Sequence, residues 1–374
     1  MGFQNLSTPE VAAIVRERVR TVVFAAGGTT RWFMLNYLGG WPTDMSYWEG
    51  YLRQDGQRFL EIARMFFDHG VPTLFTHAVV PGQLEGRDEA YVHLALTTGM
   101  ERIAGSPEFL HFYEEYGVRV RFFGNYRQVL AGSQYACTLA HFDRIEERTS
   151  ANSQHLLFWG FNSEEDQVTP VMELAVQFYR GQGRTPSREE VAELYYGEGV
   201  EPVDIFIGFN RPKIACLMPP LLDGRADLYF TVGLSFDFPQ SQLRRILYDH
   251  LYARKGRHRD YGELSADAFS EMQDFYRLNQ GRVLGIGRRY ESGDIWHAMP
   301  QVRLPSGWDE GGSANRRISE GAHRNAFTDR NPRDRNLRVH DAHRNAAADQ
   351  NPYGDQNPSA HGRESSARRG ASFG

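Results

Sequence analysis

One short segment of the chain, Ala25–Arg31 (AAGGTTR), has the residue types that hold a phosphate group. It follows an apolar stretch and precedes a predicted helix, so backbone N–H groups would point at a bound anion. Glycine lets the backbone approach a ligand, threonine hydroxyls donate hydrogen bonds, and arginine grips an oxyanion with two N–H groups. The residues expected to bind phosphate are Gly27, Gly28, Thr29, Thr30 and Arg31. The segment matches neither a Walker loop nor GxGxxG, so an ordinary strand-to-helix turn stays open.

A second basic segment, Phe209–Lys213 (FNRPK), follows another predicted strand, Val203–Gly208 (VDIFIG). Parallel strands bring their carboxyl ends to one edge of a sheet, where ligands bind. Arg211 and Lys213 would then form a second grip on phosphate. A solvated basic loop is the alternative interpretation.

Asp227 begins the predicted strand Asp227–Leu234, and it is the residue that we predict to bind Mg²⁺ if a metal is used. Magnesium takes one or two carboxylates and completes its shell with phosphate oxygens and water. A capping or solvated carboxylate is the alternative. Glu164–Asp166 looks like a metal cluster but is typical of an exposed charge run. The two cysteines, Cys137 and Cys216, indicate neither a zinc site nor a disulfide framework.

Aromatic residues gather around the glycine-rich segment, and their ring faces can stabilise a cation. The group comprises Phe24, Trp32, Phe33, Tyr37, Tyr47, Trp48 and Tyr51. We expect Trp32 and Phe33 to line a substrate cavity. Phe66 and Phe67 belong to an amphipathic helix predicted over Gln57–His69, and they are candidates for the same cavity or for the core.

Strands alternate with helices along residues 7–300, which predicts an α/β fold: a mostly parallel sheet with helices on both faces. The predicted strands are Thr21–Ala26, Val71–His77, Val118–Phe123, His155–Phe161, Val203–Gly208 and Asp227–Leu234. The predicted helices include Arg87–Ile103, Pro107–Tyr116, Ser187–Tyr196 and Gln240–Arg254. In such a fold, ligands lie outside the carboxyl ends of the strands.

The chain has 374 residues and a formal net charge of −5, which argues against nucleic-acid binding. No apolar run is long enough to span a membrane and the N-terminus carries no signal pattern, so we expect a cytoplasmic protein. Residues 1–304 are expected to form one catalytic domain. Residues 305–374 are expected to be a disordered tail, because they lack an apolar face and repeat Ala322–Pro332 at Ala342–Pro352.

Five segments, taken in chain order, resemble the cis-prenyltransferases, the undecaprenyl diphosphate synthase superfamily. The segments are Thr21–Phe33 (TVVFAAGGTTRWF), Gly117–Asn125 (GVRVRFFGN), Val203–Lys213 (VDIFIGFNRPK), Leu228–Phe238 (LYFTVGLSFDF) and Arg257–Gly262 (RHRDYG). A divergent diterpene synthase branch is closer, with similar stretches at GTTRWF, ELYYGEGVEPVDIFIGFNR and LRRILYDHLYAR. The resemblance covers nearly the whole of the predicted domain and none of the tail. It implies the cis-prenyltransferase α/β fold and a homodimer.

Members of that branch ionise a bicyclic C20 allylic diphosphate and let water or another nucleophile capture the cation. The resemblance therefore implies a diterpene synthase that converts a halimane- or clerodane-type isoprenoid diphosphate into an alcohol. It implies that Gly27–Arg31 and Arg211 bind the diphosphate and that Asp227 binds Mg²⁺. Tyr51 falls on a tyrosine implicated in the site of the branch, so it would orient water or the leaving oxygen.

The chain departs from the superfamily at two positions. Gly27 stands where the superfamily has an aspartate that binds Mg²⁺, and Gly208 stands where it has an arginine. Ordinary isoprene condensation is therefore not expected. Two alternatives stay open: prenyl transfer to a small nucleophile such as adenosine, and a non-catalytic cis-prenyltransferase subunit, since such subunits have also lost the loop aspartate.

Overall fold

The computed structural model describes residues 2–38, 48–79, 89–161, 167–214, 218–254, 264–290, 295–299, 301 and 303. The spatial contacts group Met1–Glu310 as one compact unit. Several expectations lie outside the described residues: the charge run Glu164–Asp166, the aromatic Tyr47, the segment Arg257–Gly262 and the tail 305–374. Among the described residues, no helix is both long and apolar enough to cross a membrane.

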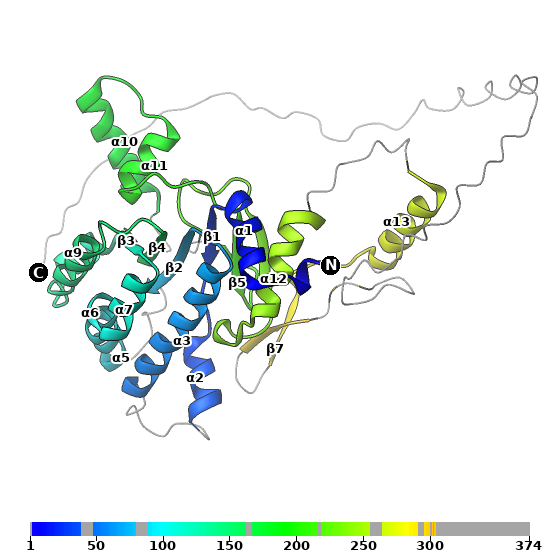
Figure 1. Ribbon diagram of the computed structural model, residues 1–374, viewed down its shortest axis with the longest axis horizontal. Coiled ribbons are helices and arrows are strands. Elements are labelled where there is room, and N and C mark those ends of the chain that lie inside the picture. Colours follow the sequence, from blue (N-terminus) through cyan, green and yellow to red (C-terminus); the bar gives the residue numbers. More distant parts are fainter. Residues whose placement is uncertain are drawn as a thin grey trace, which may run out of the picture. The chain divides into compact units, whose positions relative to one another are not determined.

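A sheet of six strands forms the centre of the fold, in the order β3-β4-β2-β1-β5-β6, and every neighbouring pair is parallel (Figure 1). The strands are β1 (Thr21–Phe24), β2 (Thr73–Val79), β3 (Val118–Gly124), β4 (His155–Phe161), β5 (Ile205–Phe209) and β6 (Asp227–Thr231). All six predicted strands and the parallel arrangement are confirmed. The chain starts at β1, builds outward to β3, and returns to the other side of β1, so β1 is the switch point where ligands bind in such sheets.

Longer helices precede, separate and follow the six strands along the chain. They are α1 (Thr8–Arg18), α2 (Thr29–Tyr37), α3 (Trp48–Asp68), α7 (Pro107–Glu115), α9 (Thr138–Arg148), α10 (Val168–Gln182), α11 (Arg188–Tyr196), α12 (Gln240–Tyr248) and α13 (Ala266–Asn279). Shorter elements are η1 (Phe3–Asn5), α5 (Glu89–Leu94), η2 (Ala95–Gly99), α6 (Met100–Gly105), α8 (Tyr126–Ala131), η4 (Ser235–Asp237) and η5 (Asp249–Ala253). An antiparallel pair, β7 (Gly287–Tyr290) and β8 (Ile295–Ala298), forms a separate sheet.

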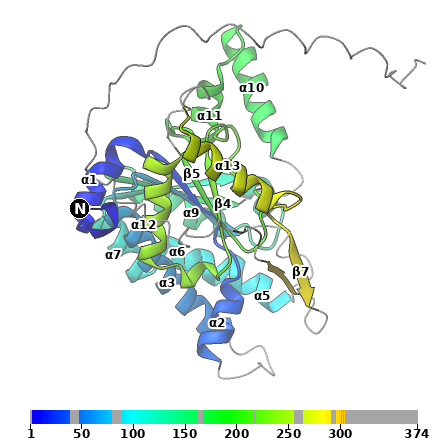
Figure 2. The same cartoon turned by 90° about the vertical axis from the view of Figure 1, so that its right-hand side faces the viewer.

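Alternate residues of β1 point to opposite faces of the sheet, as strand geometry requires. Val22 and Phe24 join the larger apolar cluster, which contains residues of α1, α3, α7 and α9. Val23 and the following Ala25 join a second cluster that includes Ala192 of α11. Figure 2 shows α11 on one side of the strands and α3, α6 and α7 on the other. The prediction of helices on both faces is therefore confirmed.

Helix α3 is longer than the sequence predicted. It begins at Trp48 instead of Gln57, and its buried face continues the helical spacing through Tyr51. Those additional turns matter because they bring the first part of α3 beside the loop that follows β1.

Phe66 and Phe67 pack in the core and are absent from the lining of the candidate cavity. The Phe66 ring lies 5.4 Å from the Phe24 ring, and the Phe67 ring lies 5.9 Å from the Phe112 ring. Both side chains are less than 2% exposed. Of the two alternatives predicted for Phe66 and Phe67, the structure shows the core position, because they lie in the last turns of α3, near the start of β2.

Candidate active site

The loop between β1 and α2 lies at the carboxyl edge of the sheet, next to the loops that follow β5 and β6. Gly28 caps α2 with a left-handed backbone, φ 73°. A Cβ atom at this position would lie 2.9 Å from Leu234 Cδ2, so a side chain there would be both strained and crowded. The N–H of Ser235 donates to the carbonyl of Gly27 at 3.2 Å, which ties the loop to η4.

Arg31, in the first turn of α2, has its guanidinium beside this loop. Its Nη2 atom lies 3.3 Å from the place that a Cβ on Gly28 would occupy, so the guanidinium folds back toward the helix N-terminus. Within the described ranges, no carboxylate forms an ion pair with Arg31. A guanidinium beside free helix N–H groups is a binding site for an oxyanion.

Arg211 follows β5, and β5 pairs directly with β1. The two strands run in register from Val22 and Ile205 onward, so Arg211 and the loop before α2 lie at the same edge of the sheet. The Arg211 side chain is exposed, and its guanidinium lies 5.9 Å from the centre of the Trp296 ring. The structure therefore places both Arg31 and Arg211 at the carboxyl ends of the strands, and the side chain of Arg211 is exposed to solvent there.

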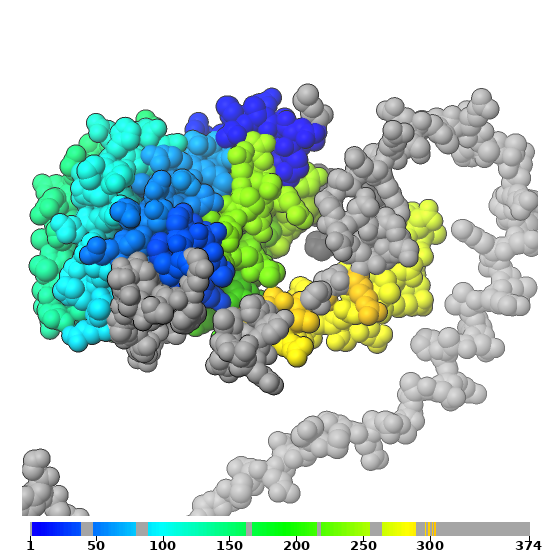
Figure 3. Space-filling model, turned by 90° about the horizontal axis from the view of Figure 1, so that it is seen from below, coloured from blue at the N-terminus to red at the C-terminus, as the bar shows by residue number. Residues whose placement is uncertain are grey.

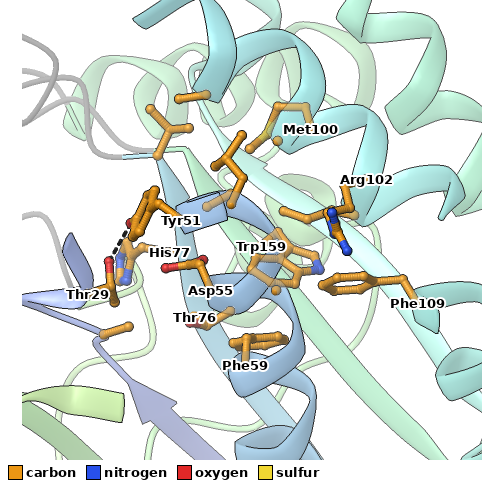
Figure 4. A pocket seen from close by; sticks show the side chains of 18 of the residues that line it. Thr29, Tyr51, Asp55, Phe59, Thr76, His77, Met100, Arg102, Phe109 and Trp159 are labelled. Atoms are coloured by element: carbon orange, nitrogen blue, oxygen red, sulfur yellow. Dashed lines mark hydrogen bonds between the residues drawn. The ribbon is translucent and has the colours of Figure 1, made fainter. Parts of the chain in front are cut away.

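A cavity of about 130 Å³ opens beside the loop, between α3, the β2 strand and the segment α5–η2–α6 (Figure 4). Its aromatic walls come from Tyr51, Phe59, Tyr91, Phe109, Trp159 and Phe236. Its polar lining comes from Thr29, Asp55, Thr76, His77 and Arg102. Segment η2 is π-helical, a form that recurs at functional sites. Figure 3 shows the molecule from below, where blue N-terminal elements lie between cyan and green elements.

Tyr51 joins the cavity to the loop. Its hydroxyl lies 2.7 Å from Thr29 Oγ1, with either group as the donor (Figure 4). Burial raises the pKa of Tyr51 well above its usual range, and the nearby Asp55 carboxyl adds to the rise. The phenol is therefore neutral at physiological pH and available as a hydrogen-bond donor. The structure places the Tyr51 hydroxyl between the loop before α2 and the cavity, and its role toward water or the leaving oxygen stays a prediction.

Asp55 is a cavity residue that the sequence interpretation missed. It lies on α3 one turn after Tyr51, and its side chain points into the cavity in Figure 4. Burial raises the pKa of Asp55 to about 6, and the hydroxyls of Tyr51 and Thr29 partly offset that rise. Its spacing of four residues from Tyr51 is the signal that could have found it, because such residues share one face of a helix.

Trp32 and Phe33 lie behind the cavity wall instead of lining it. The Trp32 ring packs edge-on against Phe236, with 5.1 Å between ring centres. The Phe33 ring packs against Tyr51 at 5.7 Å. Both residues thus hold the aromatic walls in place, and neither is among the residues that line the cavity.

The two positions where the chain departs from the superfamily differ in the space around them. A Cβ atom on Gly27 would be 3.7 Å from its nearest neighbour, Phe209, so a side chain fits there. A Cβ atom on Gly208 would be 2.7 Å from the Phe230 ring and 3.0 Å from the Phe206 ring. An arginine therefore cannot replace Gly208 unless these rings move.

Asp227 lies at the amino ends of the strands, the edge of the sheet opposite the loop between β1 and α2. It is the first residue of β6 and pairs in register with Ile205, which is level with Val22 near the start of β1. Its carboxylate accepts from His250 Nδ1 at 2.7 Å and pairs with Arg254 at 3.3 Å. The prediction that Asp227 takes part in catalysis is therefore corrected: the parallel register holds it several residues below the phosphate loop.

The magnesium site predicted from the sequence needs one or two carboxylates together with phosphate oxygens, and it stays a prediction. Among the described residues, no group of three or more His, Cys, Asp or Glu side chains is placed to hold a metal ion. Asp55 is the carboxylate that lines the cavity, and it lies among aromatic rings where desolvation of a divalent ion would be costly. The Asp227 carboxylate already has a hydrogen bond with His250 and an ion pair with Arg254.

The six-stranded parallel sheet, with a glycine-rich loop at the end of β1, is an α/β fold of the cis-prenyltransferase-like class. The chain is 36% identical over 299 residues to a tuberculosinyl adenosine transferase of Mycobacterium tuberculosis, which covers 79% of this chain and 97% of that protein. The chain belongs to the family of that enzyme, the divergent branch that the sequence resembled.

A second relative is a (+)-kolavelool synthase of Herpetosiphon aurantiacus, 27% identical over 280 residues, covering 74% of this chain and 88% of that protein. A solved structure, lavandulyl diphosphate synthase from Lavandula x intermedia in complex with dimethylallyl diphosphate, is 16% identical with a TM-score of 0.47. It covers 68% of this chain and all of that one. No family model matches the chain. Both relatives are enzymes: one transfers a prenyl group and the other is a terpene synthase.

Proposed function

We propose that the chain is a diterpene synthase that ionises a bicyclic C20 allylic diphosphate of the halimane or clerodane type and captures the cation with water. The products would be a diterpene alcohol and diphosphate. The observation that carries the proposal is Arg31, which forms no ion pair with any carboxylate in the described part of the chain, at a helix N-terminus beside an aromatic cavity.

The loop would hold the diphosphate and stabilise its departure. The N–H groups at the start of α2, the hydroxyl of Thr30 and the guanidinium of Arg31 would bind its oxygens, with Arg211 as an outer contact. Preorganised donors of this kind are worth most where negative charge develops in the transition state. Breaking the allylic C–O bond leaves a carbocation on the hydrocarbon and the bonding electrons on the diphosphate.

The cavity would hold the cation away from bulk water. The ring faces of Tyr51, Tyr91 and Phe236 line it, and aromatic faces attract cations. Its volume of about 130 Å³ is below the roughly 300 Å³ at which whole-ligand pockets begin. Part of a C20 group would therefore extend through the open mouth, or the walls would move apart on binding.

A second candidate function is prenyl transfer to adenosine. The name of the relative with 36% identity favours it. The same ionisation would serve both functions, and the nucleophile would differ: water in one case and a nitrogen of adenosine in the other. The homodimer implied by the resemblance also stays a prediction.

Product analysis would test these proposals. Purified full-length protein would be incubated with bicyclic and linear C20 diphosphates, with and without adenosine, and products would be identified by mass spectrometry. We expect an alcohol from the bicyclic substrates, a lower rate with geranylgeranyl diphosphate, and no elongation with isopentenyl diphosphate. A prenylated adenosine product would support the second function. A protein that is inert alone but activates a co-expressed cis-prenyltransferase would contradict both.

A further inference from the structure

Resting on this proposed function, we propose that the carboxylate of Asp55 accepts the proton of the water that captures the cation. Asp55 would thus be a catalytic residue in a chain whose phosphate loop has none of its own carboxylates. The inference depends on three features of the cavity: the position of Asp55, the hydroxyl groups beside it, and a buried polar atom on β2.

Asp55 stands between the phosphate loop and the aromatic walls. It lies on the turn of α3 after Tyr51, and the Tyr51 hydroxyl lies 2.7 Å from Thr29 at the start of α2. Figure 4 shows its carboxylate on the side of the cavity where Tyr51, Thr29 and His77 also lie. A cation formed from a diphosphate at the loop would therefore lie close to Asp55.

Thr76 offers a second polar contact for the same water. Its side chain is fully buried on β2 and lines the cavity, and Figure 4 shows it beside Asp55. The Thr76 hydroxyl has no hydrogen-bond partner in the part of the chain that the structure describes. Buried hydroxyls normally have a partner, and a buried water needs two or more polar contacts. A water between Thr76 and Asp55 satisfies both requirements.

The proton has to leave the water during capture. The water oxygen forms the new C–O bond with the cation, which gives a protonated alcohol. The O–H bond of that group then breaks, its electrons stay on oxygen, and the proton passes to the Asp55 carboxylate. Asp55 returns the proton to bulk solvent after the products leave. No oxidant, reductant or further reactant is needed.

The pKa of Asp55 suits this role. Burial raises it to about 6, so the carboxylate is ionised at neutral pH and is still a stronger base than an exposed aspartate. Efficient general bases have a pKa near the working pH. The other titratable or charged side chains that line the cavity are Tyr51 of α3, His77 of β2, Tyr91 of α5 and Arg102 of α6. The experiment therefore has to separate Asp55 from His77.

Asp55→Asn removes the base and nearly preserves its shape. We expect alcohol formation to fall at least about 100-fold, since loss of a general base typically costs 10²–10⁴ in rate. Diphosphate release should fall much less, because ionisation depends on Arg31, and the product should shift toward hydrocarbons formed by proton loss. A merely structural role would lower both rates equally. Asp68→Asn, at the exposed end of the same helix, is the matched control and should keep wild-type rates.

The pH profile of alcohol formation provides the second measurement. The wild type should lose activity below about pH 6, and Asp55→Asn should lose that acid limb while His77→Gln keeps it. An Asp55→Asn variant with a wild-type alcohol rate and pH profile would overturn the inference. So would an acid limb that disappears in His77→Gln and persists in Asp55→Asn. A wild type inert toward every C20 diphosphate would instead overturn the proposed function itself.

Discussion

The amino ends and the carboxyl ends of the strands, which form two opposite edges of the central sheet, differ in whether their charged residues have partners. At the amino edge, Asp227 is paired with His250 and Arg254, and the neighbouring Asp204 accepts from the N–H groups of Arg20 and Thr21. At the carboxyl edge, Arg31 has no acidic partner among the described residues. The comparison teaches that charges already neutralised by the protein stabilise the fold, whereas a charge left for a ligand marks the site.

The largest expected effect is on Arg31. Arg31→Ala should lower turnover at least about 100-fold, because one preorganised donor to developing charge is typically worth 10²–10³ in rate. Steady-state assays of diphosphate release would measure it. Arg20→Ala, on the residue just before β1 at the opposite edge, is the matched control and should leave turnover unchanged. If both variants behave alike, the difference between the two edges has no functional meaning.

Removal of the Asp55 carboxylate should raise the stability of the protein while it lowers the activity. A carboxyl whose pKa is raised by folding, here from 3.8 to about 6, stabilises the fold below the lower value and loses that stabilisation as pH rises through the upper one. Asp55→Asn should therefore be more stable than wild type at pH 8, by at most about 3 kcal/mol, and equally stable near pH 4. Urea denaturation at both pH values measures this, and a variant that is less stable at pH 8 would contradict it.

Arg211 should matter less than Arg31, because its side chain is exposed and lies at the outer side of the edge. Arg211→Ala should lower kcat/KM about tenfold, the size expected when one solvent-screened contact to a phosphate is lost. Raising the salt concentration should also lower kcat/KM of the wild type, because salt screens the contact between Arg211 and phosphate. An effect as large as that of Arg31→Ala would move Arg211 to the centre of the site.

Asp227 should show the smallest effect on catalysis. Asp227→Asn should keep kcat within about twofold and respond to magnesium as the wild type does, since the ion pairs of Asp227 lie at the far edge. Its unfolding free energy should fall by about 1 kcal/mol, because hydrogen bonds to a charged group are lost from a partly exposed site. Loss of magnesium dependence in this variant would restore the role that the sequence predicted.

Much of the fold could be predicted from the sequence, because strand and helix periods are local properties. All six strands were found, and His155–Phe161 was found with its observed bounds. Helix α9 was missed although Thr138, Phe142 and Ile145 repeat at helical spacing and are buried. Its pattern falls in a polar stretch, which concealed the short apolar stripe.

The site could be predicted only in part. The loop residues Gly27–Arg31 are adjacent in sequence, so their common location follows from one turn. The error at Asp227 arose because a strand has residues at both edges of the sheet. Which edge a residue lies at depends on the register with neighbouring strands, which is a long-range property. Asp55 was missed because its raised pKa depends on burial and on a contact with Thr29 of another helix. A local sequence pattern does not indicate either of these.

The π-helical turn at Ala95–Gly99 sets the direction in which the side chains of α6, the next helix segment, point. Each α-helical residue advances the side chains by about 100° and 1.5 Å, so deletion of one residue from this turn would rotate α6 by about that angle. Arg102 and Ile103 would then leave the cavity wall, while Tyr91 on α5 would stay. A single-codon deletion in this turn would thus change the part of the cavity wall that α6 supplies, Met100, Arg102 and Ile103, without altering the loop between β1 and α2.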